Sequence, residues 1–152
     1  MPLNDLLAAH AVLPALKAKN KKQVLQELAA RAAEWCGGQE REIFETLLHR
    51  ERLGSTGIGQ GVAIPHGKLT SLGRLVGLFA RLEKPIDFDA LDGQPVDLIF
   101  LLLAPEGAGA DHLKALARIA RLLRDEQTAA QLRSARDEAA LRSLLTAPAA
   151  AA

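Results

Sequence analysis

The chain has 152 residues, of which 49% are hydrophobic and 24% charged, a balance that predicts one folded domain and excludes a disordered protein. Nineteen basic and eighteen acidic residues leave a formal charge of +1, which provides no electrostatic surface for nucleic acid or an anionic membrane. A single cysteine, no signal-peptide pattern and no apolar run near the ~20 residues of a membrane span predict a cytoplasmic protein without an internal disulfide.

The first predicted elements are a strand and a helix. Val12–Ala18 fits either a strand or a helix, and Pro14 favours a strand at the edge of a sheet. Asn20 followed by Gln23 has the spacing of a capping box at the start of a helix. Gly37 readily adopts the left-handed conformation of a helix end, so we expect this helix to stop there.

A second helix and a glycine-rich segment follow. Apolar residues at helical spacing predict a helix over Gln39–Arg52, which Gly54 ends. Five glycines between positions 54 and 67 then indicate a loop, which leads into a short strand over Val62–Ile64. We expect this strand to end at Pro65-His66, since a proline restricts the preceding residue to extended conformations.

Two strands and the C-terminal helices complete the chain. Leu75–Leu82 and Val96–Leu103 are predicted strands, and the nearly continuous apolar character of the second is typical of a strand covered on both faces. Lys84-Pro85 and Asp92–Pro95 indicate turns between them. A strong helix over Asp111–Arg124 precedes one or two shorter helices that reach position 145, and the alanine-rich tail over 147–152 should fray. We therefore expect one α/β domain, a mostly buried sheet flanked by helices.

His66 stands out among the four histidines. It follows an apolar strand and a rigid proline, and Gly61 and Gly67 on either side would allow another molecule to approach closely. A neutral imidazole in such a loop can act as a nucleophile or as a general acid or base near pH 7. The alternative is a polar residue that merely ends a strand. His49, in contrast, lies opposite the apolar stripe of its helix and should face water.

His112 and Arg50 are candidates because of helix geometry. His112 lies in the first turn of its helix on the inner face, where a helix N-terminus disfavours imidazolium and favours anions such as phosphate. The alternative is a histidine at the edge of the core that bonds to one carbonyl. Arg50 lies at the edge of an apolar stripe, toward the glycine-rich segment, as an ordinary snorkelling side chain also would. Glu51 lies nearer the middle of that stripe, so helical phase does not single out Arg50.

The sequence contains no motif for a metal or a nucleotide. Gly57–Gly61 is neither a dinucleotide fingerprint nor a phosphate-binding loop, because no Lys-Ser/Thr pair follows and no helix is expected there. Asp87–Gly93 is similar to the start of a calcium loop, but Leu91 stands where the third ligand belongs and Leu98 where the closing glutamate should be. No Cys/His cluster suggests zinc. We expect no metal and no cofactor.

The stretch Arg50–Lys68, which reads RERLGSTGIGQGVAIPHGK, resembles the enzyme IIA proteins of the bacterial phosphoenolpyruvate-dependent phosphotransferase system. Within that system it is similar to the fructose/mannitol-type group, and above all to its nitrogen-related IIA regulators. The resemblance continues through Phe88–Phe100 and His112–Ala117 and covers nearly the whole chain. It implies a mixed sheet sandwiched by helices in one IIA domain over residues 1–146.

The resemblance also implies a phosphotransferase component that forms a phosphohistidine. His66 matches the histidine that accepts a phosphoryl group from a small histidine-containing phosphocarrier protein. His112 matches a second histidine that helps to hold this group, and Arg50 matches an arginine that neutralises its charge. Three further positions match residues that line the site: Ser55, Thr56 and Gly67.

Two functions of this family remain open from the sequence. One is a regulator linked to nitrogen metabolism and potassium transport, whose phosphorylation state target proteins read, and Gly67-Lys68-Leu69 is more typical of that branch. The other is a sugar-specific IIA component that passes phosphate to a IIB domain during fructose- or mannitol-type uptake. A binding module without phosphotransfer is a third possibility, which the intact His66, His112 and Arg50 disfavour. Neither nucleic-acid binding nor membrane insertion is expected.

Overall fold

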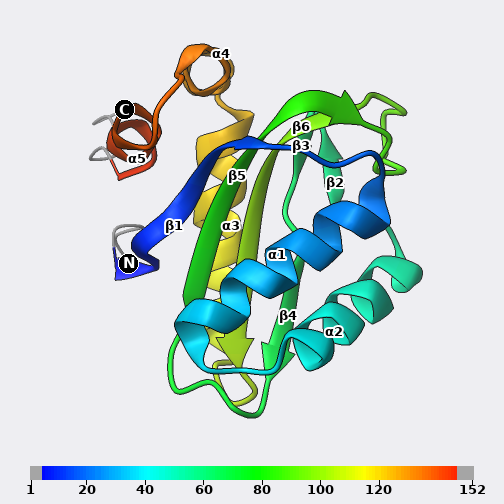
Figure 1. Cartoon of the computed structure of the whole chain (residues 1–152), viewed down its shortest axis with the longest axis vertical. Coiled ribbons are helices and arrows are strands. Elements are labelled where there is room, and N and C mark those ends of the chain that lie inside the picture. Colours follow the sequence, from blue (N-terminus) through cyan, green and yellow to red (C-terminus); the bar gives the residue numbers. More distant parts are fainter. Residues whose placement is uncertain (1–4, 147–152) are drawn as a thin grey trace.

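The computed structural model describes residues 5–146, and in this range one sheet of six strands is covered by helices on both faces (Figure 1). The strands are β1 (Leu7–Leu16), β2 (Gly57–Gly59), β3 (Val62–Ala63), β4 (His66–Leu69), β5 (Val76–Ile86) and β6 (Val96–Pro105). The helices are α1 (Lys21–Cys36), α2 (Glu40–Leu53), α3 (Ala110–Arg124), α4 (Glu126–Ser134) and α5 (Glu138–Thr146). The predicted tail over 147–152 lies outside the described residues.

The sheet is mixed, as the resemblance implies, with the strand order β1-β5-β6-β3-β2 and with β4 paired to β6. β5 and β6 are antiparallel, whereas β1 is parallel to β5, and both β3 and β4 are parallel to β6. β6 therefore has β5 on one side and β3 followed by β4 on the other. The predicted α/β class and the buried character of the last strand are confirmed.

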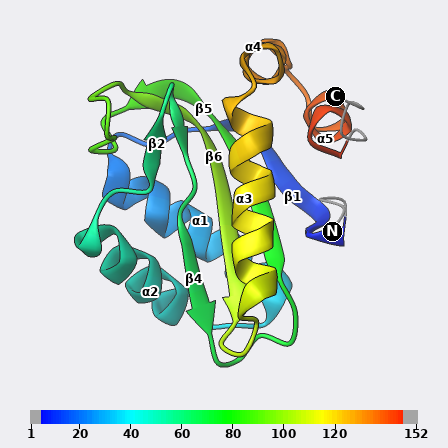
Figure 2. The ribbon, with the colours of Figure 1, turned by 180° about the vertical axis from the view of Figure 1, so that it is seen from behind.

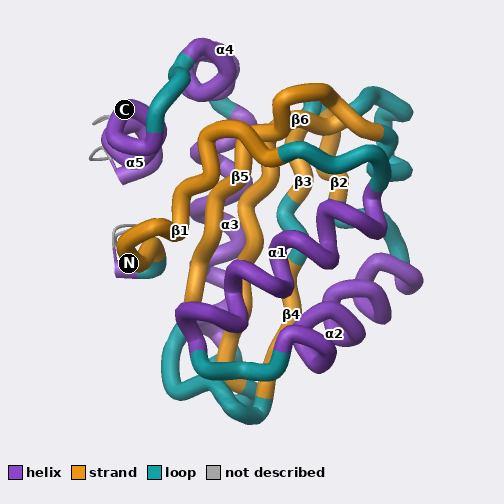
Figure 3. Tube along the Cα trace, viewed as in Figure 1, coloured by secondary structure: helices purple, strands orange, loops and turns teal. Residues whose placement is uncertain are grey.

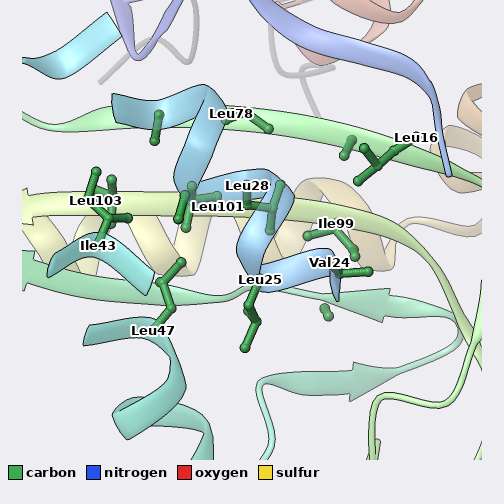
Figure 4. Packing of buried hydrophobic residues seen from close by; sticks show 14 of the residues in the cluster. Leu16, Val24, Leu25, Leu28, Ile43, Leu47, Leu78, Ile99, Leu101 and Leu103 are labelled. Carbon is green, nitrogen blue, oxygen red and sulfur yellow. The ribbon is translucent and has the colours of Figure 1, made fainter. Parts of the chain in front are cut away.

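Alternate residues of the central strands separate the core into two layers. Leu78 of β5 and Leu101 of β6 point to α1 and α2, where Leu25, Leu28, Ile43 and Leu47 cover them (Figure 4). On the other face lies α3, seen in front of the sheet in Figure 2. The second layer contains residues of the same two strands together with α3, α4 and α5: Phe79, Leu98, Phe100, Leu102, Ile119, Leu123, Leu132, Leu141 and Leu145. Burial of both faces accounts for the uninterrupted apolar sequence of β6.

The predicted ends of the first helix are confirmed. The Asn20 side chain accepts a hydrogen bond from the backbone N–H of Gln23 at 2.9 Å, and Gly37 is left-handed with φ of 70°. The Gln23 side chain reaches back to the N–H of Lys19 at 2.8 Å, one residue before the position that a capping box uses.

The first strand is at the sheet edge, as Pro14 indicates, but its predicted bounds are wrong. β1 begins at Leu7 and ends at Leu16, before Ala18. The earlier start follows from burial, because Leu7 and Val12 pack in the second core layer and pair with β5. Alanines and a histidine between them hide this pattern in the sequence.

The turn predicted at Lys84-Pro85 is also wrong, because β5 continues to Ile86. The pairing with β6 shifts between Arg81 and Ile86, so four residues of β5 lie opposite one residue of β6. A proline fits such an irregular stretch because the hydrogen-bond ladder is already interrupted there. Ile86 returns to the core and pairs with Val96.

Part of the segment predicted as a loop is a β-hairpin. β2 and β3 are antiparallel, and the two residues between them, Gln60 and Gly61, have φ of 57° and 79°. Positive φ at both central positions is the geometry of a tight hairpin turn. The sequence signal was hidden, because β2 consists of two glycines around Ile58 and has low strand propensity.

The strand predicted to end at Pro65-His66 instead resumes at His66. Ala63 pairs with Ile99 and His66 with Leu102, so β3 and β4 follow β6 in one register. Figure 3 shows the two segments one after the other along the sheet. Pro65 has no N–H to donate, but its carbonyl accepts a hydrogen bond from Leu102 at 3.0 Å and keeps the ladder aligned.

None of the helices in the described part of the chain is long and apolar enough to span a bilayer.

Candidate active site

His66 is the first residue of β4, at a part of the sheet where β4 is hydrogen bonded to β6. Successive side chains of a strand point to opposite faces. Gly67 faces α2, where Thr46 packs against it, and Leu69 belongs to the core layer under α1 and α2. The imidazole of His66 therefore lies on the α3 side of the strand, half-buried.

The hydrogen bonds of His66 define its tautomer. Its Nδ1 lies 2.8 Å from the carbonyl oxygen of Ile64, which can only accept, so Nδ1 carries the hydrogen. In the neutral ring, Nε2 then has a lone pair, and the Nε–H of Arg50 donates to it at 3.3 Å. The nucleophilic nitrogen therefore faces a guanidinium group.

The surroundings of His66 favour the neutral ring. Burial is the largest cause that lowers its pKa from the usual 6.5, and the positive charge of Arg50 lowers it further. The Ile64 carbonyl and the carboxylate of Glu51 act in the opposite direction and raise it, but the net shift is downward. The lowered pKa favours the neutral imidazole at neutral pH, which is the form that can act as a nucleophile.

Arg50 is held in the last turn of α2. Its Nη1 donates to the carbonyl oxygen of Gly54 at 2.9 Å, which fixes the side chain along the end of the helix. The remaining N–H groups of the guanidinium fork are available for an oxyanion beside His66. The structure brings together Arg50 and His66, as the resemblance implies.

His112 approaches His66 from the other side. It is the third residue of α3 and is 6% exposed. The two imidazole rings have centroids 5.6 Å apart and an interplanar angle of 72°. Burial lowers the pKa of His112, and so do the positive charges of His66 and Lys68 when they are present.

The Nε2 of His112 is buried and has no hydrogen-bond partner among the described residues. The adjacent helix N-terminus also lacks a side-chain cap, because its N-cap residue is Gly109. Unpaired N–H groups at a helix start favour an anion. The expected alternative, in which His112 bonds only to a carbonyl at the edge of the core, does not describe this nitrogen.

Ser55 and Thr56 follow α2, but their hydroxyl groups already have partners in the protein. The Ser55 hydroxyl donates to the Phe88 carbonyl at 2.6 Å, and the hydroxyl of the buried Thr56 donates to Glu51. Both residues thus stabilise the segment that follows Arg50.

The glycines around His66 are packed within the protein. A Cβ at Gly67 would lie 2.7 Å from Cγ2 of Thr46, and one at Gly61 would meet the guanidinium of Arg133. The space expected here for another molecule is therefore used by the protein itself. Gly67 allows α2 to approach β4 closely, and this brings Arg50 to His66.

Two residues next to the site were not predicted. Glu51 is 7% exposed, and its carboxylate lies 2.9 Å from Nζ of Lys21, the first residue of α1. Its position near the middle of the apolar stripe was the signal in the sequence, since an acidic residue there must be buried. No pattern in the sequence indicates Lys21.

Within residues 5–146, no group of three or more His, Cys, Asp or Glu side chains is arranged to hold a metal ion. The groups that surround the His66 imidazole are a guanidinium, a second imidazole and a helix N-terminus.

Comparison with protein families identifies a match over residues 5–147 to the family described as "Phosphoenolpyruvate-dependent sugar phosphotransferase system, EIIA 2". A protein of Bradyrhizobium diazoefficiens named "Nitrogen regulatory protein" is 66% identical over 152 residues, which is 100% of this chain and 99% of that protein. The "PTS system fructose-specific EIIABC component" of Bacillus subtilis is 37% identical over 142 residues, 93% of this chain but 22% of that protein.

Among solved structures, the nitrogen regulatory protein IIA-Ntr from Neisseria meningitidis superposes with a TM-score of 0.91 at 35% identity. The match covers 95% of this chain and 99% of that chain.

Proposed function

Because the chain belongs to the EIIA 2 family of the phosphoenolpyruvate-dependent sugar phosphotransferase system, we propose that it carries a phosphoryl group on His66, received from a histidine-containing phosphocarrier protein. The observation that carries the proposal is the neutral His66, whose Nε2 faces Arg50 and whose ring lies 5.6 Å from that of His112. These groups supply a nucleophile and two partners for phosphoryl oxygens, in the domain over residues 1–146.

In the proposed reaction, the Nε2 lone pair of His66 forms a bond to phosphorus. The P–N bond to the donor histidine breaks, and its electron pair returns to the donor imidazole. The Nδ1 proton of His66 stays on the ring, hydrogen bonded to the Ile64 carbonyl. This carbonyl raises the pKa of His66 and so stabilises the positive charge that the ring gains as the N–P bond forms.

Arg50 has a double role in this mechanism. Before transfer, its Nε–H occupies the Nε2 lone pair and opposes protonation of the ring. For transfer, this N–H must exchange Nε2 for a phosphoryl oxygen, which offers a charge-assisted hydrogen bond in place of a neutral one. Phosphoryl transfer is accelerated mainly by positioning and by stabilisation of charge on three oxygens, which a guanidinium performs well.

His112 and the N-terminus of α3 complete the proposed site. The buried Nε2 of His112 would pair with a second phosphoryl oxygen, and the uncapped helix start favours the negative charge. In this proposal three further residues line the site: Ser55, Thr56 and Gly67. The hydroxyl groups of Ser55 and Thr56 are bonded within the protein, and Gly67 packs against α2, so these residues support the site without contacting the phosphoryl group. No metal or cofactor is required.

We further infer that this phosphoryl carrier is a nitrogen-related regulator in the cytoplasm, whose target proteins read the state of His66. The 66% identity over the full length of a protein named as a nitrogen regulatory protein supports this. A sugar-specific IIA component with a IIB domain as acceptor is less supported, because the fructose-specific relative is 37% identical and this chain matches 22% of it.

The test is phosphorylation from phosphoenolpyruvate with enzyme I and the phosphocarrier protein, followed by intact mass. We expect an acid-labile gain of one phosphoryl group in the wild type and in His49→Ala, whose histidine is exposed on α2, and none in His66→Ala. Phosphorylation of His66→Ala at the wild-type rate would refute the assignment.

A further inference from the structure

A buried ionic network lies next to the His66 site and centres on Glu51, a residue to which the proposed phosphoryl step gives no role. Glu51 follows Arg50 in the last turn of α2. Its Oε1 accepts from Nζ of Lys21 at 2.9 Å and from the backbone N–H of Thr56 at 3.0 Å, and its Oε2 accepts from the Thr56 hydroxyl. One carboxylate thus joins the start of α1, the end of α2 and the segment after α2.

A buried ion pair such as Glu51–Lys21 is weak evidence for a role in stability. The Glu51 and Lys21 side chains are 3% and 18% exposed, and withdrawing two charges from water costs free energy that a packed apolar pair would not. Lys21 also lies over the ring of Phe88, 4.8 Å from its centroid, which keeps the ammonium in one place. Retained ion pairs of this kind can specify one arrangement of the groups around them.

Two further hydrogen bonds connect this ionic network to His66. The carbonyl of Thr56 accepts from the backbone N–H of Ile64 at 3.0 Å. The carbonyl of Ile64 accepts from Nδ1 of His66 at 2.8 Å. A continuous series of bonds therefore connects the Glu51 carboxylate to the imidazole, although Glu51 does not touch the reacting nitrogen.

We propose that Glu51 is a positioning residue for His66: with Lys21 it holds Thr56, which holds Ile64, which keeps the imidazole in the Nδ1–H tautomer with Nε2 free to accept the phosphoryl group. The catalytic consequence rests on the proposed function, whereas the tautomer can be measured without it. Glu51 also raises the pKa of His66, so its charge favours the positive ring that forms during transfer.

The main test replaces Glu51 with glutamine, which keeps the volume but has one acceptor oxygen for three donors. Nitrogen-15 NMR of the histidine rings reports the tautomer of His66 in the unphosphorylated protein. We expect the Nδ1–H form alone in the wild type and a mixture with the Nε2–H form in Glu51→Gln. The matched control is Glu83→Gln, which makes the same change in the exposed pair Lys17–Glu83, 3.7 Å apart. It should leave the tautomer unchanged.

Kinetics give a second measurement. In Glu51→Gln, kcat for phosphorylation by the phosphocarrier should fall roughly 10- to 100-fold, as for other residues that orient a reacting group, while KM for the phosphocarrier stays the same. An unfolded fraction would also lower the apparent kcat at the same KM, so the rate is expressed per folded molecule, whose fraction the NMR spectra report. A lower kcat per folded molecule at an unchanged KM then identifies positioning rather than loss of donor binding.

Thr56 provides a test that does not depend on the folding of Glu51→Gln. Thr56→Val keeps the shape but leaves Oε2 of Glu51 without its hydroxyl donor, and Thr56→Ser restores that donor. We expect the valine variant to show the mixed tautomer and the lower kcat, and the serine variant to recover both.

An unchanged His66 tautomer in both Glu51→Gln and Thr56→Val overturns the proposal. Failure of the wild type to accept phosphate from an active donor pair would instead refute the proposed function, and the NMR comparison would still decide whether Glu51 positions the ring.

Discussion

The Nε of Arg50 donates to Nε2 of His66 at 3.3 Å, although the two residues are sixteen positions apart and belong to a helix and a strand. The contact exists because Gly67 lets α2 approach β4 and because Nδ1 of His66 is committed to the Ile64 carbonyl. The guanidinium thus occupies the lone pair that, in the proposed function, bonds to phosphorus.

Removal of this cation should change both the titration and the rate. In Arg50→Ala, the pKa of His66 should rise toward its usual value, because the positive charge that lowers it is lost. Phosphorylation should slow by roughly 100- to 1,000-fold, as when one preorganised donor to a developing oxyanion is removed. NMR titration and quenched-flow kinetics measure the two effects, with the exposed Arg52→Ala as the control on the same helix turn. An unaltered titration of His66 would show that the contact has no electrostatic role.

His112 should matter for the phosphorylated state more than for the fold. His112→Ala removes a partner of the phosphoryl group, so transfer should slow by about 10- to 100-fold, the value of one hydrogen bond to a charged group. The same loss should shorten the lifetime of the phosphorylated protein, which intact mass follows over time. His49→Ala, at an exposed position, should behave as the wild type, and equal lifetimes in the two variants would exclude a role for His112.

Stability should depend on pH through the two buried histidines. The pKa values of His66 and His112 lie below 6.5 in the folded protein, chiefly because of burial. Between these values and pH 6.5 the unfolded chain binds more protons than the folded protein. The free energy of unfolding therefore has its full value above pH 6.5 and decreases as the pH falls through that interval. Urea unfolding from about pH 7.5 to 5 should show this decrease, and a double variant with alanine at both positions should show a smaller one.

The close packing at Gly67 gives a prediction for stability. Gly67→Ala inserts a Cβ 2.7 Å from Thr46 Cγ2, and such overpacking costs about 1–3 kcal/mol. The shift of α2 away from β4 should also lengthen the contact between Arg50 and His66 and slow phosphorylation. Gly73→Ala is the control, since nothing lies within 4 Å of its Cβ and its φ is not positive. Urea unfolding of both variants measures the difference, and equal midpoints would contradict it.

Much of the fold could be predicted from local patterns, because burial in this protein follows regular periods. The stripe of α1, its Asn20 cap and the two-sided burial of β6 each left a direct trace in the sequence. The hairpin of β2 and β3 left none, since glycines that permit positive φ at its turn also resemble a flexible loop. Likewise Pro85 indicates a turn locally, but the burial of Ile86 keeps β5 extended.

The site was predictable in part. Helical phase placed His112 inward and Arg50 at the edge of a stripe, and the structure shows both beside His66. The tautomer of His66 was not predictable, because it depends on a hydrogen bond to a carbonyl two residues earlier, which no pattern in the sequence indicates. Lys21 was not predictable either, because its partner is thirty residues away and reaches it only after α1 and α2 pack together.

The pairing of β4 with β6 has a consequence for which parts of the site can move. β6 is paired along both sides, so its amides should exchange with deuterium only when the entire domain unfolds. His66 lies on β4, which is bonded to β6 along one side and is thereby attached to this protected strand. Arg50 lies in the last turn of α2, where its Nη1 is bonded to the Gly54 carbonyl and the adjacent Glu51 is buried. In the proposed transfer the end of the helix therefore stays in place, and only the Nε–H of Arg50 has to exchange the imidazole for a phosphoryl oxygen.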